Sequence, residues 1–298
     1  MKEIAVHIND LEDLRRVFSS YNKVNVVWFE EIDCMRDEER LRKTIDHNNI
    51  QFWFSDTVWP NHSDKRFLYY LWASATDQTV NYESYVSRHF ISLNNESRKH
   101  RIQFLDSMYE YYLFNHSLIS WSNRKIKIKG IQQTVDWIGN KIDDAPESIL
   151  PIIDLPMKEV NKSAVSIVLE TYIDKTDISE KTFQCLAIGQ PFISYGMPYL
   201  YRYLTEMGFE LLPLVDYAFD RERNHKKRQK MIIKELKKLT EYKASDLKNI
   251  FKEVSLYNQE KFKEIVRTLE FPFAFDTVLS KDVKETKKQL LIKQDLYQ

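Results

Sequence analysis

A short apolar helix with a lysine in its first turn is the first feature that could do chemistry. Residues 178–196 read ISEKTFQCLAIGQPFISYG. Ser179 is suited to cap this helix, because its hydroxyl can accept from first-turn amides, and Gly189 suits the left-handed residue that ends it. The first turn carries Glu180 and Lys181. Exposed amides and the helix dipole attract phosphate there, and a lysine adds a point charge. The dipole also favours a glutamate there by about 0.3–1 kcal/mol. The local chemistry therefore leaves two readings open, a simple cap and a ligand site.

A second helix start is unusually cationic. Residues 90–114 read FISLNNESRKHRIQFLDSMYEYYLF, which predicts a strand, a turn and a helix capped by Asn94 or Asn95. The predicted apolar stripe of this helix consists of Ile102, Leu105, Tyr109 and Tyr112. Extending the stripe backward places Arg98 on the inner face, with Arg101 beside it. Cations in the first turn oppose the helix dipole, and a bound anion would resolve that conflict. Salt bridges to Glu96 and its neighbours are the alternative, which we expect for Lys99. At Arg98 and Arg101 we expect a phosphate-type ligand.

Both helix starts need a scaffold that brings them to one place. In the first 125 residues, short apolar runs alternate with helical patterns, which predicts a parallel sheet covered on both faces. The predicted strands are residues 4–8, 24–29, 50–54, 89–93 and 117–121. A second alternating unit has strands at 163–172, 191–195 and 209–212 and helices at 180–188 and 198–207. This β-α-β-α-β order is half of a doubly wound sheet, whose ligands bind at the carboxyl ends of the strands.

Composition bounds the class of protein. Lysine plus arginine and aspartate plus glutamate both total 44, so no whole-chain field points to nucleic acid. The two cysteines, Cys34 and Cys185, form neither a disulfide framework nor a zinc cluster, which predicts a reducing cytoplasm. No apolar run approaches the roughly 18–20 residues of a membrane span, and the N-terminus lacks a signal-peptide core. We expect a cytoplasmic protein that has no membrane span and no metal.

Two blocks of the sequence resemble a known family. SLNNESRKHRIQFLDSMYEYYLFNHSLISWSN (92–123) and ETYIDKTDISEKTFQCLAIGQPFISYGMPYLYRYLTEMGF (170–209) resemble predicted glycosyltransferases of large bacterial viruses and some bacteria. The second block is also similar to the donor-binding domain of bacterial α-1,3-fucosyltransferases, which have the GT-B architecture. The resemblance implies an α/β fold with two Rossmann-like domains and a charged helical C-terminal tail. The expected boundaries are an acceptor-side domain at 1–125, a connector at 126–160, a donor-binding domain at 161–245 and the tail at 246–298.

The resemblance also implies roles for individual residues. The glutamate of the family motif binds the ribose or the sugar and the lysine binds the diphosphate, which implies these roles for Glu180 and Lys181. Glu170, at the end of its strand, is an alternative contact for the sugar. The full predicted donor-binding set is Arg98, Arg101, Glu170, Ser179, Glu180, Lys181 and Thr182. The chain departs from the family at Ser194-Tyr195-Gly196-Met197-Pro198, where the family has a glycine-rich turn.

The implied reaction moves a sugar from a UDP- or GDP-linked donor to a hydroxyl group, without a metal or another cofactor. The acceptor could be a glycan, a protein or a hydroxymethylated DNA base, inside a bacterium or a virus-infected host cell. In an inverting enzyme, a carboxylate or a histidine from the first domain must deprotonate the acceptor. Glu30, Glu31 and Asp56 follow predicted strands and are the candidates for this base.

Two other classes of function stay open. The chain could be a non-catalytic binding protein that keeps a GT-B shell without turnover. It could also bind DNA through the basic run from Arg221 to Lys238, which is expected to be helical, with an apolar stripe at Ile232, Leu236 and Leu239.

Overall fold

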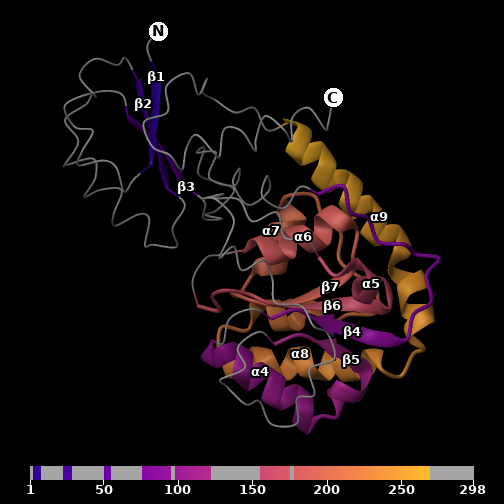
Figure 1. Cartoon of the computed structure of the whole chain (residues 1–298). Helices are drawn as coiled ribbons and strands as arrows, with labels where there is room; N and C mark the ends of the chain where they lie inside the picture. Colours follow the sequence, from indigo (N-terminus) through magenta and orange to yellow (C-terminus); the bar gives the residue numbers. More distant parts are fainter. Residues whose placement is uncertain are drawn as a thin grey trace. The chain divides into compact units, whose positions relative to one another are not determined.

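The chain forms two compact units in a computed structural model (Figure 1). The structure describes the backbone of three strands, at residues 3–7, 23–28 and 50–54, and residues 76–94, 98–121, 155–174 and 178–268. The three N-terminal strands belong to the first unit, and the described residues from Thr76 to Glu264 belong to the second.

The described part of the first unit is a parallel sheet. Its strands are β1 (Glu3–His7), β2 (Lys23–Trp28) and β3 (Ile50–Phe54), in the order β1-β2-β3. Val26 of β2 is aligned with Val6 on one side and with Phe52 on the other. The strands predicted at 4–8, 24–29 and 50–54 are confirmed to within one residue, and so is their parallel pairing.

The second unit is built on a four-stranded parallel sheet. Its strands are β4 (Arg88–Ser92), β5 (Ser117–Ile119), β6 (Ser163–Leu169) and β7 (Phe192–Tyr195), in the order β5-β4-β6-β7. The first strand of this sheet along the chain thus lies between the second and the third, as in doubly wound sheets of the 2-1-3-4 order. The topological switch point lies between β4 and β6, and this is where such sheets bind ligands at their carboxyl edge.

Helices cover both faces of this sheet. In Figure 1, α4 (Lys99–Glu110) and α8 (His225–Leu239) lie on one face, and α6 (Glu180–Ile188) and α7 (Leu200–Glu206) lie on the other. The remaining described helices are α5 (Met157–Asn161), η2 (Leu113–His116), η3 (Tyr217–Arg221) and α9 (Ala244–Thr268). The central strand β6 is buried at every position except Ser166, as expected of a parallel strand between two helical layers.

The predicted boundary between residues 125 and 126 is wrong for this sheet. β4, expected in the N-terminal domain, pairs with β6, expected in the donor-binding domain, and Phe90 is aligned with Val165. The described residues between Thr76 and Trp121 therefore share one unit with residues 161–245, the predicted donor-binding domain. Alternation along the chain predicts which strands exist, but it does not predict which strands pair, because pairing depends on contacts distant in sequence.

Two further expectations about the C-terminal half are corrected. Residues 209–212 form no strand; Asn258 of α9 instead bonds both the amide and the carbonyl of Glu210, at 2.8 and 2.9 Å. The predicted tail begins inside α9, whose side chains Leu247, Phe251 and Phe262 are buried. This part of α9 therefore belongs to the core of the second unit. The predicted connector at 126–160 lies largely outside the described residues.

The inner face of α4 differs from the predicted stripe. Its buried residues are Arg101, Phe104, Leu105 and Met108, whereas Tyr109 and Tyr112 are 38% and 77% exposed. The predicted cap at Asn94 is not formed, because this buried side chain donates to Ser92 and Ser120, and Asn95 lies outside the described residues. The N-cap is Arg98, which has extended backbone and no side-chain cap.

Candidate functional site

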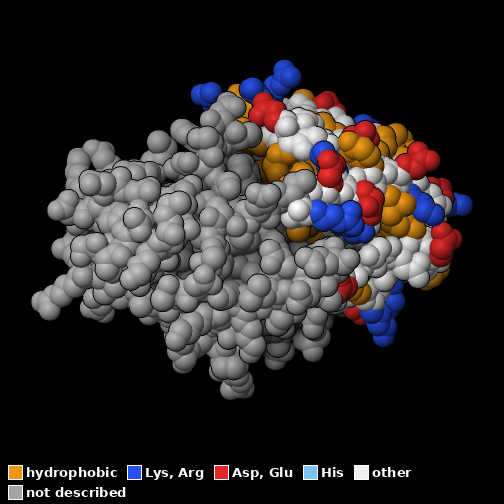
Figure 2. Space-filling view, turned by 90° about the horizontal axis from the view of Figure 1, so that it is seen from above, with side chains coloured by type: hydrophobic (Ala, Val, Ile, Leu, Met, Phe, Trp, Pro, Cys, Tyr) orange, Lys and Arg blue, Asp and Glu red, His pale blue; other side chains and the backbone are white. Residues whose placement is uncertain are grey.

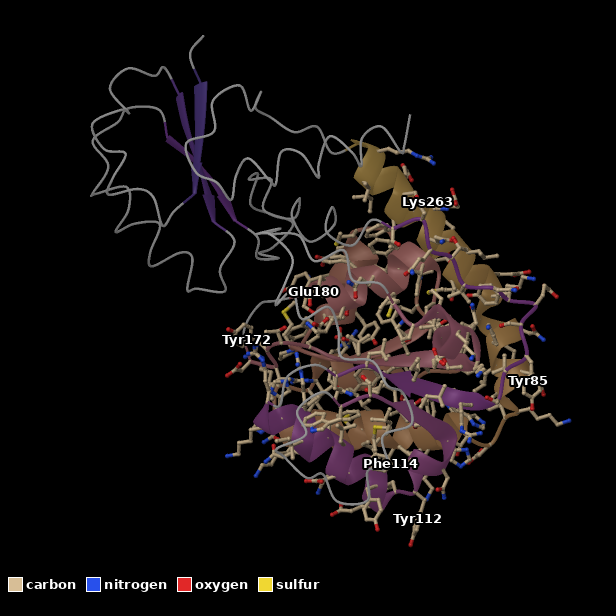
Figure 3. The ribbon with its side chains drawn as sticks, in the orientation of Figure 1. Tyr85, Tyr112, Phe114, Tyr172, Glu180 and Lys263 are labelled. Carbon is tan, nitrogen blue, oxygen red and sulfur yellow. The ribbon has the colours of Figure 1, made fainter. Side chains whose placement is uncertain are left out.

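The predicted ligand residues gather at the carboxyl edge of the second unit's sheet, at the switch point. β4 leads into α4, and β6 leads into α6, on the opposite face. Figure 3 shows Tyr172, which follows β6, and Glu180, the first residue of α6, on the same side of the unit. The starts of α4 and α6 thus approach one another from the two sides of the sheet.

The carboxylate of Glu170 joins β6 to α6 and β7. One of its oxygens, Oε2, accepts from the amide and the hydroxyl of Ser179, with the amide at 3.2 Å. The other, Oε1, accepts from the hydroxyls of Thr182 and Ser194. The residue is fully buried, and burial raises the pKa of its carboxyl although Lys181 and the hydroxyls of Ser179 and Thr182 lower it. Glu170 is therefore a positioning residue, with its oxygens taken up by the protein.

The main chain of Glu170 holds the start of α4. Its carbonyl oxygen accepts from Nε2 of His100 at 2.9 Å and from Nε of Arg101 at 3.3 Å. This contact explains why the buried Arg101 faces inward. Burial lowers the pKa of His100, and the charges of Arg101 and Arg98 lower it further. The neutral form of the imidazole is therefore favoured, with its proton on Nε2 facing the carbonyl of Glu170.

The start of α6 holds a short ion pair. Ser179 is the N-cap, and its hydroxyl accepts from the amide of Lys181 at 3.4 Å. Lys181 Nζ lies 2.6 Å from Glu180 Oε1 and 3.4 Å from Thr171 Oγ1, and the Lys181 and Glu180 side chains are 26% and 21% exposed. Burial raises the pKa of Glu180, but the charge and hydrogen bond of Lys181 outweigh it and the net pKa is lowered. The site therefore presents a charged pair to solvent.

Cations line both sides of this edge. The guanidinium of Arg98 lies 5.2 Å from the centre of the Tyr172 ring, on the segment that follows β6. The charge of Arg101 acts on Glu180, which couples the two helix starts electrostatically. Such an arrangement of two helix starts, two arginines and a lysine can hold a ligand with several anionic oxygens.

A third helix begins at the same edge, and sequence reasoning missed its key residue. Arg228 of α8 is buried and donates to the carbonyl oxygens of Glu222 and Ile173, both at 2.6 Å. Its guanidinium lies 5.9 Å from the ring of Tyr195, whose hydroxyl donates to the carbonyl of His225. The signal was present, because Arg228 precedes the stripe residues Ile232 and Leu236 by four and eight positions.

The turn after β7 approaches Glu170 closely at Gly196. A Cβ atom added there would lie 2.8 Å from Glu170 Cγ and 2.7 Å from Leu200 Cδ1. Glu170 also donates its amide to the carbonyl of Tyr195 at 3.1 Å. Residues 194–198 thus depart from the family's glycine-rich turn, but they keep a glycine where the backbone must pass the buried carboxylate.

All the predicted donor-binding residues thus lie at this edge of the sheet. They are Arg98, Arg101, Glu170, Ser179, Glu180, Lys181 and Thr182. The candidate bases Glu30, Glu31 and Asp56 lie outside the described residues. Within the described ranges, no three histidine, cysteine, aspartate or glutamate side chains are grouped as metal ligands. Within those same ranges, no helix is both long and apolar enough to cross a membrane.

The fold and the site define an α/β protein whose parallel four-stranded sheet carries charged side chains along its carboxyl edge, at the switch point. No protein-family model matches the chain, and no curated protein matches it.

Proposed function

We propose that the protein is a glycosyltransferase that binds a nucleoside-diphosphate sugar at the carboxyl edge of its four-stranded sheet. The observation that carries the proposal is the meeting of the starts of α4 and α6 at Glu170, which brings Arg98, Arg101 and Lys181 to one edge. The resemblance of residues 92–123 and 170–209 to glycosyltransferases supports the same assignment.

In this proposal, the diphosphate of the donor competes with Glu180 for the ammonium group of Lys181. The two groups are now held together at 2.6 Å, and a ligand with two negative phosphates is a stronger partner for a lysine than one carboxylate. Glu180, released from Lys181, accepts from hydroxyl groups of the ribose or the sugar. The amides at the helix starts and the cations stabilise the charge on the leaving diphosphate, as an oxyanion hole does.

The acceptor and the base belong to the first unit in this proposal. The parallel strands β1, β2 and β3 support a second α/β domain there. Glu30, Glu31 or Asp56 would take the proton from the acceptor hydroxyl, which belongs to a glycan, a protein or a hydroxymethylated DNA base.

Calorimetric titration with UDP and GDP tests the donor site. The wild-type protein should bind one of the two, and Lys181→Ala should weaken that binding roughly 10- to 150-fold, from about 1.5–3 kcal/mol for a hydrogen bond to a charged group. Lys261→Ala is the matched control, because Lys261 is 27% exposed and pairs with Glu264 at 2.9 Å on α9. Binding by neither nucleotide, or equal losses in the two variants, would refute the site. If the protein instead binds a nucleotide sugar but transfers the sugar to no acceptor, it is a non-catalytic binding protein.

A further inference from the structure

The outward face of α8 carries a row of lysines. Its sequence HKKRQKMIIKELKKL places all six lysines within an arc of about 120° at 3.6 residues per turn. These residues, called the lysine track below, are Lys226, Lys227, Lys230, Lys234, Lys237 and Lys238, and all are exposed. The opposite side of the helix is buried in the core through Ile232, Ile233, Leu236 and Leu239. The track is therefore a polar surface with no apolar stripe left to insert into a lipid layer.

The lysines of the track form few ion pairs. Among the described residues, the ion pairs of α8 involve only Lys238, which lies 3.6 Å from Glu235. On α9, by contrast, Lys252, Lys261 and Lys263 each pair with a glutamate at 2.8–3.0 Å. Positive and negative side chains also alternate on the face that Figure 2 shows. The charge on α8 is thus a local excess in a chain whose formal net charge is zero.

The first lysines of the track occupy an unfavourable place. Lys226 and Lys227 lie in the first turn of α8, which contains no acidic residue. Cations at a helix start oppose the dipole by about 0.3–1 kcal/mol each. Asn224 offsets this cost by capping both amides at 3.1 Å. An anionic partner would turn the unfavourable placement into a favourable one.

Exposed tyrosines lie at the far end of the track. The two helices run side by side: Gln229 near the start of α8 donates to Gln103 and Ser107 in the middle of α4, and Lys237 lies 6.0 Å from the ring of Tyr111 at the end of α4. Tyr112 follows, with 77% of its surface exposed. Figure 3 shows it pointing away from the body of the unit.

The backbone of Tyr112 is in the left-handed region, with φ of 61°. A non-glycine residue there costs of order 1 kcal/mol, and bulky residues adopt this conformation rarely. Among the described residues, the ring gains no burial that would offset the cost of this backbone conformation. A large aromatic side chain is therefore displayed to solvent at a position where glycine would suit the backbone better.

We propose that the lysine track and Tyr112 bind single-stranded nucleic acid. The lysines follow the phosphodiester backbone, and the exposed tyrosine ring stacks on an unpaired base, which is the combination that sequence-tolerant single-strand binding uses. From Lys226 to Lys238 the track is about 18 Å long at 1.5 Å per residue, which matches about five nucleotides of a strand that stays stacked at the duplex spacing of about 3.4 Å. The exposed aromatic ring favours an unpaired strand over a duplex, because duplex bases are not available for stacking.

The proposed surface uses different residues from the nucleotide-sugar site, although α8 begins at the same edge of the sheet. Its residues do not include Arg98, Arg101 or Lys181, and binding should not require a nucleotide. A failure of one proposal therefore does not decide the other: UDP or GDP binding tests the sheet edge, and oligonucleotide binding tests α8.

Fluorescence anisotropy with a labelled twelve-residue oligothymidylate tests the proposal on the full chain. If four lysines contact phosphates, binding should weaken roughly 50-fold between 50 and 200 mM salt, at about 0.7 logarithmic units of slope per contact. Lys230→Gln combined with Lys234→Gln should reduce this loss to roughly sevenfold. Lys261→Gln combined with Lys263→Gln removes the same charge from α9 and should leave the slope unchanged.

Tyr112→Gly tests the aromatic part without straining the fold, because glycine accepts the left-handed backbone. It should weaken oligothymidylate binding about fivefold or more and leave binding of an abasic strand of equal charge unchanged. Tighter binding of a duplex than of the single strand, equal salt slopes in the two lysine variants, or binding to anionic vesicles alone would each overturn the proposal.

Discussion

Replacing Glu170 should destabilise the second unit, because its carboxylate joins three elements. Four donors converge on it, the amide and hydroxyl of Ser179 and the hydroxyls of Thr182 and Ser194. Glu170→Ala leaves all four without this partner in a fully buried place. At about 0.5–1.5 kcal/mol for each net hydrogen bond, the loss is about 2–6 kcal/mol.

The desolvation of the Glu170 carboxylate narrows the range expected for the alanine variant. The carboxylate is desolvated, which raises its pKa, so removing it also removes a cost to the folded state. We therefore expect Glu170→Ala to lower the free energy of unfolding by about 2–4 kcal/mol, in the lower part of the range set by hydrogen bonding. Glu170→Gln keeps one acceptor for Ser179 and offers an amide to the two other hydroxyls, so its loss should stay below about 2 kcal/mol.

Urea unfolding followed by tryptophan fluorescence measures both variants. In thermal unfolding, the alanine variant should melt roughly 4–16 °C lower, at about 2–4 °C per kcal/mol for a domain of this size. An alanine variant within about 0.5 kcal/mol of the wild type would refute the reasoning that this carboxylate holds the site together. Equal losses in the two variants would show that the negative charge matters and the hydrogen-bond geometry does not.

Two further predictions concern other parts of the second unit. Gly196→Ala should cost about 1–3 kcal/mol, because its Cβ would contact Glu170 and Leu200 at less than 3 Å, and thermal unfolding measures the loss. Burial lowers the pKa of Lys248, whose Nζ donates to Asn81, Ser84 and Asn161, to about 8. Because the unfolded chain then binds more protons between pH 8 and the ordinary pKa of 10.5, wild-type stability should rise with pH across this window relative to Lys248→Gln, and parallel curves would contradict it.

The features that could be predicted from the sequence are those with local causes. The helix at 180–188 is confirmed residue for residue, because Ser179 caps it and Gly189, with φ of 70°, ends it in the left-handed region. The strands of both sheets follow from continuous apolar runs between helical patterns. The stripe of α8 is also confirmed, since Ile232, Leu236 and Leu239 are buried.

The features that could not be predicted depend on distant partners. The pairing of β4 with β6 is decided by contacts across the sheet, and no local pattern encodes it. The rotation of α4 depends on the carbonyl of Glu170, which draws Arg101 inward in place of the expected tyrosines. Glu170 itself was predicted as a ligand contact, but its burial is visible only once Ser179, Thr182 and Ser194 are placed around it.

A crystal soaked with the nucleoside diphosphate that binds in solution tests the central claim most directly. We predict that the diphosphate lies at the starts of α4 and α6, within hydrogen-bond distance of Lys181 Nζ, and that the 2.6 Å contact between Lys181 and Glu180 is broken. A diphosphate bound elsewhere, with that contact intact, would contradict the account.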